Sequence, residues 1–135
     1  MFHEVTLKRV IVDQNGDDKL LNERYLTENK EVLSESEYAT LQLFPECDVT
    51  CIKVSTLLEF INERENEKQF IYLINLEQKF LDENGKEITT KYAVGLFCEN
   101  LQKASSIALE YAKESIGGDM ELVSVRKTKF IDIIK

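Results

Sequence analysis

The residues best suited to chemistry in this sequence are three cysteines, one histidine and a short acidic loop. Cys47 and Cys51 stand four residues apart at the entry to a predicted strand, where alternation places them on one face but too far apart for a disulfide bond. A structural zinc site needs four suitable ligands, and His3 is the only histidine. We therefore expect three free thiols, no metal site and a reducing compartment.

The acidic loop at residues 13–18, Asp-Gln-Asn-Gly-Asp-Asp, has some features of a calcium-binding loop. An EF-hand loop has Gly at its sixth position and a bidentate Glu at its twelfth. Here Gly16 is the fourth residue and Arg24 the twelfth. Asn followed by Gly is typical of a type I′ turn, because both central residues of that turn need positive φ. The motif predicts a β-hairpin, and calcium binding is the alternative.

No arrangement of nucleophile and base is evident along the chain. A cysteine–histidine pair would have to use His3, which precedes the first predicted strand, and there is no Gly-x-Ser-x-Gly elbow. Gly117 and Gly118 precede a predicted strand, so they lack the helix N-terminus at which a glycine loop holds phosphate. The sequence predicts no enzyme, no cofactor, and no catalytic, cofactor-binding or metal-binding residues.

The net charge of −8 is distributed unevenly along the sequence. Residues 1–69 carry −7 and residues 70–135 carry −1. Proteins bind a phosphate backbone chiefly through Lys and Arg, so such a surface disfavours DNA and RNA. We expect little nucleic-acid binding by the chain as a whole.

Two charged clusters are candidate partner-binding residues. Asp17 and Asp18 belong to the acidic part of the chain and could dock on a basic protein surface. Arg126, Lys127 and Lys129 could form a local basic patch, with a solvated strand edge as the alternative.

A short motif occurs twice and indicates the fold. Val-Asp-Gln-Asn-Gly at residues 12–16 recurs as Leu-Asp-Glu-Asn-Gly at residues 81–85, at an offset of 69 residues. Alternating apolar residues flank both copies and predict hairpins, each followed by a helix and a strand. We expect two β-β-α-β repeats, residues 1–61 and 70–135, with a charged linker at residues 62–69. A short helix is the alternative for that linker.

The first predicted helix begins with a capping box and ends at a proline. Ser34 and Glu37 form the box, and Leu33 and Tyr38 are placed as its hydrophobic staple. Pro45 ends the helix.

The second predicted helix has the clearer apolar face. Asn100 is its expected cap, Gly117 and Gly118 are its expected stop, and these apolar residues recur at helical spacing: Leu101, Ala104, Ile107, Ala108, Tyr111 and Ala112. One repeat of about 60 residues has only a marginal core. We therefore expect one compact α+β unit, a pseudo-twofold domain with an antiparallel-rich sheet of about six strands and two helices on one side.

The sequence resembles an uncharacterised family, a domain of unknown function found in Bacteroides-type bacteria and their phages. The resemblance rests on the duplicated layout, the hairpins at residues 13–16 and 82–85, the helix near Asn100, and the ending Glu-Leu-Val-Ser-Val followed by Phe-Ile-Asp-Ile-Ile. It covers most of the chain and implies a bacterial or phage origin without catalytic residues. The sequence shows neither a signal peptide nor a run of 18 apolar residues, so we expect a cytoplasmic protein.

Together these observations predict a non-enzymatic binding or assembly module that recognises a protein partner, with phage encoding as one option. One alternative is an acidic phage-type inhibitor that mimics nucleic acid. The other is a binder of a nucleotide or single strand in a groove between the repeats. Pairing of sheet edges into a homo-oligomer stays open.

Overall fold

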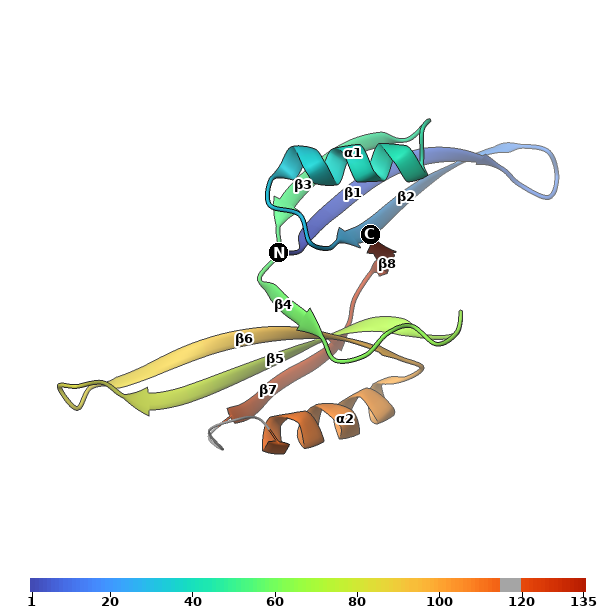
Figure 1. Ribbon diagram of the computed structural model, residues 1–135. Coiled ribbons are helices and arrows are strands. Elements are labelled where there is room, and N and C mark those ends of the chain that lie inside the picture. The colour runs from blue at the N-terminus through green and yellow to red at the C-terminus, as the bar shows by residue number, and fades with distance from the viewer. Residues whose placement is uncertain (115–119) are drawn as a thin grey trace. The chain divides into compact units, whose positions relative to one another are not determined.

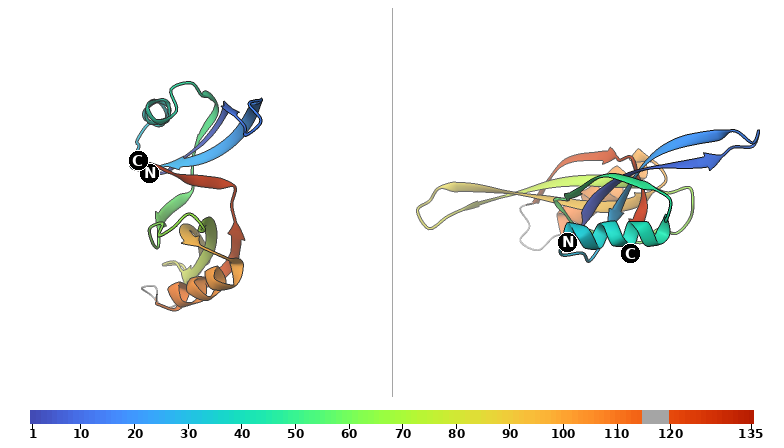
Figure 2. Two further views of the ribbon diagram at one scale, coloured as in Figure 1. Left: turned by 90° about the vertical axis from the view of Figure 1, so that its right-hand side faces the viewer. Right: turned by 90° about the horizontal axis from the view of Figure 1, so that it is seen from above.

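The computed structural model describes residues 1–114 and 120–135 and contains two four-stranded sheets, each with a helix on one face (Figures 1 and 2). In chain order the elements are β1 (His3–Val12), β2 (Asp18–Thr27), α1 (Leu33–Leu43), β3 (Asp48–Val54), β4 (Leu57–Phe60), β5 (Phe70–Leu81), β6 (Glu87–Cys98), α2 (Leu101–Glu114), β7 (Met120–Lys127) and β8 (Phe130–Ile134). The α+β class is confirmed. The expected single sheet of about six strands is wrong.

The two sheets belong to two compact units with the same strand order. Unit 1 comprises residues 1–55 and 129–135, and unit 2 comprises residues 56–128. The order is β3-β1-β2-β8 in unit 1, and β7-β5-β6-β4 in unit 2 when counted from the same end. In both sheets the last strand is parallel to its neighbour and the other pairings are antiparallel.

Each sheet takes its last strand from the other predicted repeat. β4 follows β3 along the chain but pairs with β6, and β8 follows β7 but pairs with β2. The observed units therefore differ from the predicted repeats 1–61 and 70–135. Alternation identifies a strand, but it does not identify the strand beside it in the sheet.

Residues 62–69, expected as a linker between repeats, form an ordered loop within unit 2 between β4 and β5, without a helix. The Asn62 side chain donates to the carbonyl of Phe97 and accepts from its N–H, both at 2.8 Å. The Glu65 N–H donates to Gln69 Oε1 at 2.7 Å, and Gln69 is buried. These bonds satisfy buried polar groups, which explains why such a charged segment is ordered.

The first hairpin turn is a three-residue loop and not the predicted type I′ turn. Gly16 has a φ of 80°, but Asn15 does not have positive φ. Asp13 Oδ1 accepts the N–H groups of Asn15 and Asp17 at 2.9 and 3.0 Å, and Asp13 O accepts the N–H of Gly16 at 3.1 Å. This pattern is a type I turn followed by a glycine bulge.

The second hairpin uses the same turn. Gly85 has a φ of 77°, and Asp82 Oδ1 accepts the N–H groups of Asn84 and Lys86 at 2.9 and 2.8 Å. The repeated Asp-x-Asn-Gly motif thus has a structural explanation, because the aspartate fixes the turn and the glycine supplies the left-handed residue.

Both hairpins are longer than the strands that flank them. β3 pairs with β1 only as far as Lys8, and β8 pairs with β2 only from Arg24. Residues 9–23 therefore form a two-stranded ribbon. In unit 2 the flanking pairs end at Gln78 and begin at Ala93, so residues 79–92 form a second ribbon (Figure 1).

The core of unit 2 lies between its sheet and α2. Buried side chains from three elements form it: Tyr72, Ile74 and Leu76 of β5, Val94, Leu96 and Cys98 of β6, and Ala104, Ala108 and Ala112 of α2. Asn100 caps α2 as predicted, because its Oδ1 accepts the N–H of Lys103 at 2.8 Å. Leu101, which the sequence assigned to the apolar face of this helix, is 52% exposed, so it does not belong to the buried face. The predicted stop at Gly117 and Gly118 lies outside the described residues.

Helix α1 contributes little apolar surface to the core of unit 1. Leu7, Tyr25 and Ile134 form one buried cluster of that core, and Phe2, Val5 and Leu26 are buried as well. The buried residues of α1 are Ser36 and Thr40. The predicted capping box is wrong: the helix begins two residues earlier than predicted, with Val32 at the cap position, no side-chain cap bond and Tyr38 68% exposed.

Candidate functional site

Helix α1 ends where the chain turns towards β3. Pro45 cannot continue the helix, because it has no N–H to donate and its ring clashes with the carbonyl of the preceding turn. The N–H of Phe44 donates to Thr40 O at 2.8 Å, and the N–H of Cys47 donates to Phe44 O at 3.1 Å. These bonds set Phe44 beside the ribbon of residues 9–23.

That ribbon carries apolar side chains that unit 1 leaves uncovered. Val10 and Leu20 are directly opposite each other on β1 and β2 and are 60% and 63% exposed. Val12, on the same face of β1, is 67% exposed. An isolated two-stranded ribbon is marginally stable in water. Apolar pairs on such a ribbon are therefore candidates for contact with another molecule.

Arg9 connects the ribbon to the end of α1. Its guanidinium bonds the Glu23 carboxylate through Nε and through Nη2, the latter at 3.4 Å from Oε2. It also lies over the ring of Phe44, 4.9 Å from the centroid. The hydrogen bond to Glu23 raises the pKa of Arg9 above its already high ordinary value.

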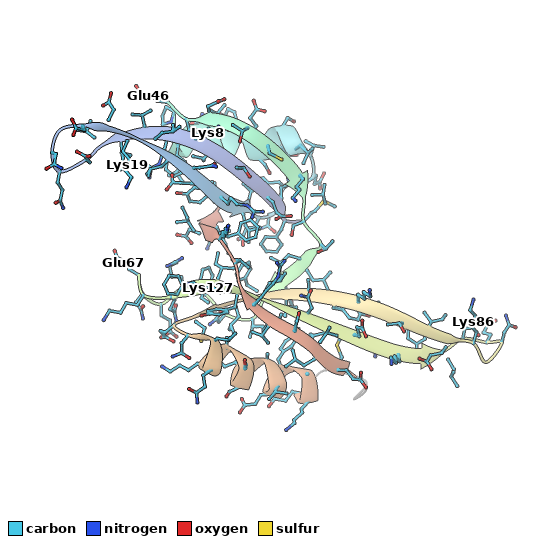
Figure 3. All side chains as sticks on the ribbon, turned by 180° about the vertical axis from the view of Figure 1, so that it is seen from behind. Lys8, Lys19, Glu46, Glu67, Lys86 and Lys127 are labelled. Atoms are coloured by element: carbon cyan, nitrogen blue, oxygen red, sulfur yellow. The ribbon has the colours of Figure 1, made fainter. Side chains whose placement is uncertain are left out.

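An open groove of about 720 Å³ lies at the end of α1, where Figure 3 labels Lys8 and Glu46. Its apolar lining is Val10, Leu20, Leu43, Phe44, Pro45 and Cys47, and its charged lining is Lys8, Arg9, Glu46 and Asp48. The volume lies within the range of about 300–1,000 Å³ of ligand pockets. Two cations and two anions leave the lining without net charge, which suits an apolar segment better than a phosphate.

The groove contains a cysteine, but not an activated one. Burial raises the pKa of the Cys47 thiol, so it is protonated at neutral pH. The thiolate is the nucleophilic form of cysteine. Cys47, Cys51 and Cys98 are all free thiols, as predicted.

His3, the only histidine, is part of β1 and is completely buried. Its Nδ1 is hydrogen-bonded to Ser36 Oγ at 2.6 Å, and that hydroxyl is bonded to Thr27 Oγ1 at 2.5 Å. A serine beside a histidine could act as a nucleophile. Here all three side chains are fully buried, so the chain of hydrogen bonds attaches α1 to the sheet.

Residues 1–114 and 120–135 contain neither a candidate metal-binding cluster nor a helix that could span a membrane. No group of three or more His, Cys, Asp or Glu side chains in this part of the chain could hold a metal ion. Within the same residues, no helix has the length and apolar character needed to cross a bilayer.

The predicted site residues lie on different elements. Asp17 and Asp18 are exposed at the tip of the first hairpin. Arg126 and Lys127 are consecutive on β7 and thus point to opposite faces, and Lys129 belongs to the other unit. Lys127 Nζ lies 3.6 Å from the ring centroid of Phe70, which is 43% exposed. None of the five lines the groove.

The structural units divide the charge evenly. Unit 1 has eight Lys and Arg against twelve Asp and Glu, and unit 2 has nine against thirteen, so each carries −4. The imbalance of −7 against −1 between residues 1–69 and 70–135 therefore does not describe two surfaces. It arises because the acidic residues 56–69 belong to unit 2 and residues 129–135 belong to unit 1.

The groove residues were not predicted, although the sequence contains one indication of them. Val5, Leu7 and Ile11 define the buried parity of the first strand, yet Val10 and Val12 occupy the opposite parity. Apolar residues on both parities near a strand end indicate an uncovered apolar surface. The contribution of Leu43 and Phe44 depends on where α1 ends over the sheet, which has no such local indication.

A comparison with models of known protein families finds no match for this chain, and neither does a comparison with curated proteins.

Proposed function

We propose that this chain is a non-enzymatic binding or assembly module, and that the groove at the end of α1 receives an apolar segment of a protein partner. The observation that carries this proposal is the exposure of Val10, Leu20 and Leu43, at 60%, 63% and 57%, around one groove.

The free energy of apolar burial favours an apolar side chain of a protein partner over a charged ligand. Burying a Val or Leu side chain completely yields about 1.5–3 kcal/mol, and these three side chains are more than half exposed. A partner that covers them gains several kcal/mol before the cost of association. The four charged residues of the lining can pair with polar groups at the edge of such a contact.

The alternatives have less support. The acidic mimic depended on a concentration of negative charge in the first part of the chain, and each unit carries −4. The single-strand binder needs exposed aromatics beside a basic patch. Phe70 under Lys127 supplies one such contact, but Arg126 lies on the other face of β7.

We also infer that the chain arose by duplication of one β-β-α-β unit. The equal strand orders and the identical hairpin turns support this origin, and the pseudo-twofold relation expected from the sequence is part of the same proposal. In such a duplication the final strand of each copy would have exchanged places with that of the other.

The proposal is tested by affinity purification from the native cell, with mass spectrometry, followed by binding measurements with the purified partner. Leu43→Lys should weaken binding by about tenfold or more, because it places a charge in the apolar groove. Leu109→Lys is the matched control, since Leu109 is a leucine on the other helix with 49% exposure. It should bind within about twofold of the original protein.

Equal losses in the two helix variants would contradict the groove as the binding site. Labelled DNA and RNA in the same assay test the main alternative. Sub-micromolar nucleic-acid binding that is abolished by Lys127→Glu would replace this proposal with the single-strand binder.

A further inference from the structure

The outer edge of β6 in unit 2 is open along half of the strand. β4 pairs with β6 from Ala93 onward, and among the described strands no other lies on that side. Residues 87–92, Glu-Ile-Thr-Thr-Lys-Tyr, therefore have a free edge on the ribbon whose tip bears Lys86 (Figure 3). Unpaired edge groups of this kind are templates for another strand.

The hydrogen bonds of the hairpin determine which residues face that edge. Asp82 N–H donates to Lys86 O at 2.9 Å, so these residues form the bonded pair nearest the turn. Bonded and non-bonded pairs alternate along an antiparallel ladder, and Leu81 is opposite Glu87 in the next pair. The backbone groups of Glu87, Thr89 and Lys91 thus point outward.

Residues further along β6 confirm this assignment. The same alternation predicts that Ala93 and Gly95 point outward as well. Ala93 is paired with Leu57 of β4, and the N–H of Ile61 donates to Gly95 O at 2.9 Å.

We propose that two copies of this chain associate through antiparallel pairing of this β6 edge, with Thr89 opposite Thr89 of the second copy. In this register Glu87 is opposite Lys91 of the second copy, and Lys91 is opposite its Glu87. The edge is therefore complementary to itself in charge as well as in backbone geometry. Three outward pairs would exchange about six hydrogen bonds across a twofold axis.

The equivalent edge in unit 1 lacks this complementarity. On β2 the outward residues before the contact with β8 are Asp18, Leu20 and Asn22, by the same alternation from the bond between Asp13 N–H and Asp17 O. Antiparallel pairing about Leu20 would set Asp18 opposite Asn22, without an ion pair. Opposite charges across a pair stabilise it and like charges destabilise it. The self-association is therefore assigned to β6 and is independent of the groove in unit 1.

Sedimentation velocity over a wide range of protein concentrations tests the proposal. The protein should form a dimer at high concentration. Lys91→Glu and Glu87→Lys should each raise the dissociation constant by about tenfold, because each turns two attractive pairs into repulsive ones. The double variant Glu87→Lys with Lys91→Glu should restore the dimer to within about threefold.

Lys19→Glu is the control for net charge, since it makes the same change on β2 of unit 1 and should leave the dimer unaffected. A single monomeric species at every concentration would overturn the proposal. A dimer that all of the charge variants leave unchanged would overturn it as well.

Cysteine cross-linking tests the register directly, in a background with Cys47→Ser and Cys51→Ser. Thr89→Cys should form an intermolecular disulfide with oxidised glutathione, because opposite bonded residues have Cα atoms about 5.5 Å apart. Thr90→Cys should cross-link far less, because Thr90 would be opposite Ile88 of the second copy. Equal cross-linking of the two variants, or preferential cross-linking of Thr90→Cys, would contradict the register.

Discussion

Helices α1 and α2 occupy the same place in the chain order of their units, but different side chains attach them to their sheets. Helix α2 buries Ala104, Ala108 and Ala112, which bring its backbone close to the apolar side chains of β5 and β6. Helix α1 buries Ser36 and Thr40. The hydroxyl of Ser36 joins His3 and Thr27, and that of Thr40 bonds Ser36 O at 2.7 Å.

The difference explains why the groove is found beside α1. Alanines fill the space under α2 with close apolar contact, which leaves little room for solvent. Small hydroxyl side chains hold the middle of α1 near the sheet, but they do not extend the core towards its end. Leu43 is consequently 57% exposed at the end of the helix, and the groove begins there.

The largest loss of stability should come from a substitution in the apolar core that α2 covers. Ile74 is completely buried in the cluster that α2 covers, so Ile74→Ala should lower the free energy of unfolding by about 2–5 kcal/mol. Denaturant unfolding measures this change in the free energy of unfolding. Leu109→Ala, on the exposed side of α2, should change stability by no more than about 0.5 kcal/mol. Similar losses in the two variants would mean that α2 does not cover an apolar core.

The packing at the end of α1 should make the protein less stable at alkaline pH. Tyr25 is buried and its ring centroid lies 5.2 Å from that of Phe44; burial raises the pKa of Tyr25 to about 12. The pKa of tyrosine in the unfolded chain is about 10. The stability that neutral Tyr25 contributes is therefore fully present below pH 10 and is lost as the pH rises towards 12. The loss should amount to about 2–3 kcal/mol.

The matched protein for that measurement is Tyr25→Phe, which cannot ionise at this position. Burial also raises the pKa values of Tyr72 and Tyr111, so Tyr25→Phe should still lose some stability at high pH. It should lose less than the original protein does. Identical alkaline losses would show that Tyr25 ionises as easily in the folded protein as in the unfolded chain.

The hydroxyl attachment of α1 should contribute less than the apolar core of unit 2. Ser36→Ala removes the group that links His3 and Thr27 and leaves both without that partner. An unsatisfied buried polar group costs about 1–3 kcal/mol, which thermal or denaturant unfolding can resolve. Ser34→Ala, two residues earlier and exposed, is the control. Alanine has a higher helix propensity than serine, so Ser34→Ala should not lose stability. If it costs as much as Ser36→Ala, the buried bond does not account for the loss.

The smallest changes in stability should come from substitutions at the cap positions of the two helices. Asn100→Ala removes the cap of α2 and should cost about 1 kcal/mol. Val32 already has the extended conformation of a cap residue, with φ −125° and ψ 154°, but no capping side chain. Val32→Asn should therefore stabilise the protein by up to about 1 kcal/mol in the same unfolding assay. A loss of stability in Val32→Asn would show that α1 cannot accept a cap there.

Local patterns in the sequence predicted local structure well. The Asp-x-Asn-Gly motif located both hairpins, and Asn100 marked the start of α2. The turn type was wrong because the aspartate side chain accepts two backbone N–H groups and lets a single glycine supply positive φ. The prediction of Ser34 as the helix cap was also wrong. A capping pattern in the sequence does not by itself show at which residue the chain first becomes helical.

Features that depend on distant residues were not predicted. Residues 57–61 and 130–134 are both rich in apolar residues, but their exchange between sheets depends on pairing across most of the chain. The groove also needs α1 and the ribbon in their final positions. Periodicity reports which face of an element is buried, and it does not report which element covers that face.

The exchange of β4 and β8 has a consequence for the order in which the chain is made. Synthesis delivers every strand of unit 2, including β4, before it delivers β8. Unit 1, although its first strands emerge earliest, lacks Ile134 of its core and the outer neighbour of β2 until then. Domains generally fold as they emerge during translation. The unit begun first is thus completed last, and β2 keeps an open edge on the nascent chain until residue 134 is free to pair.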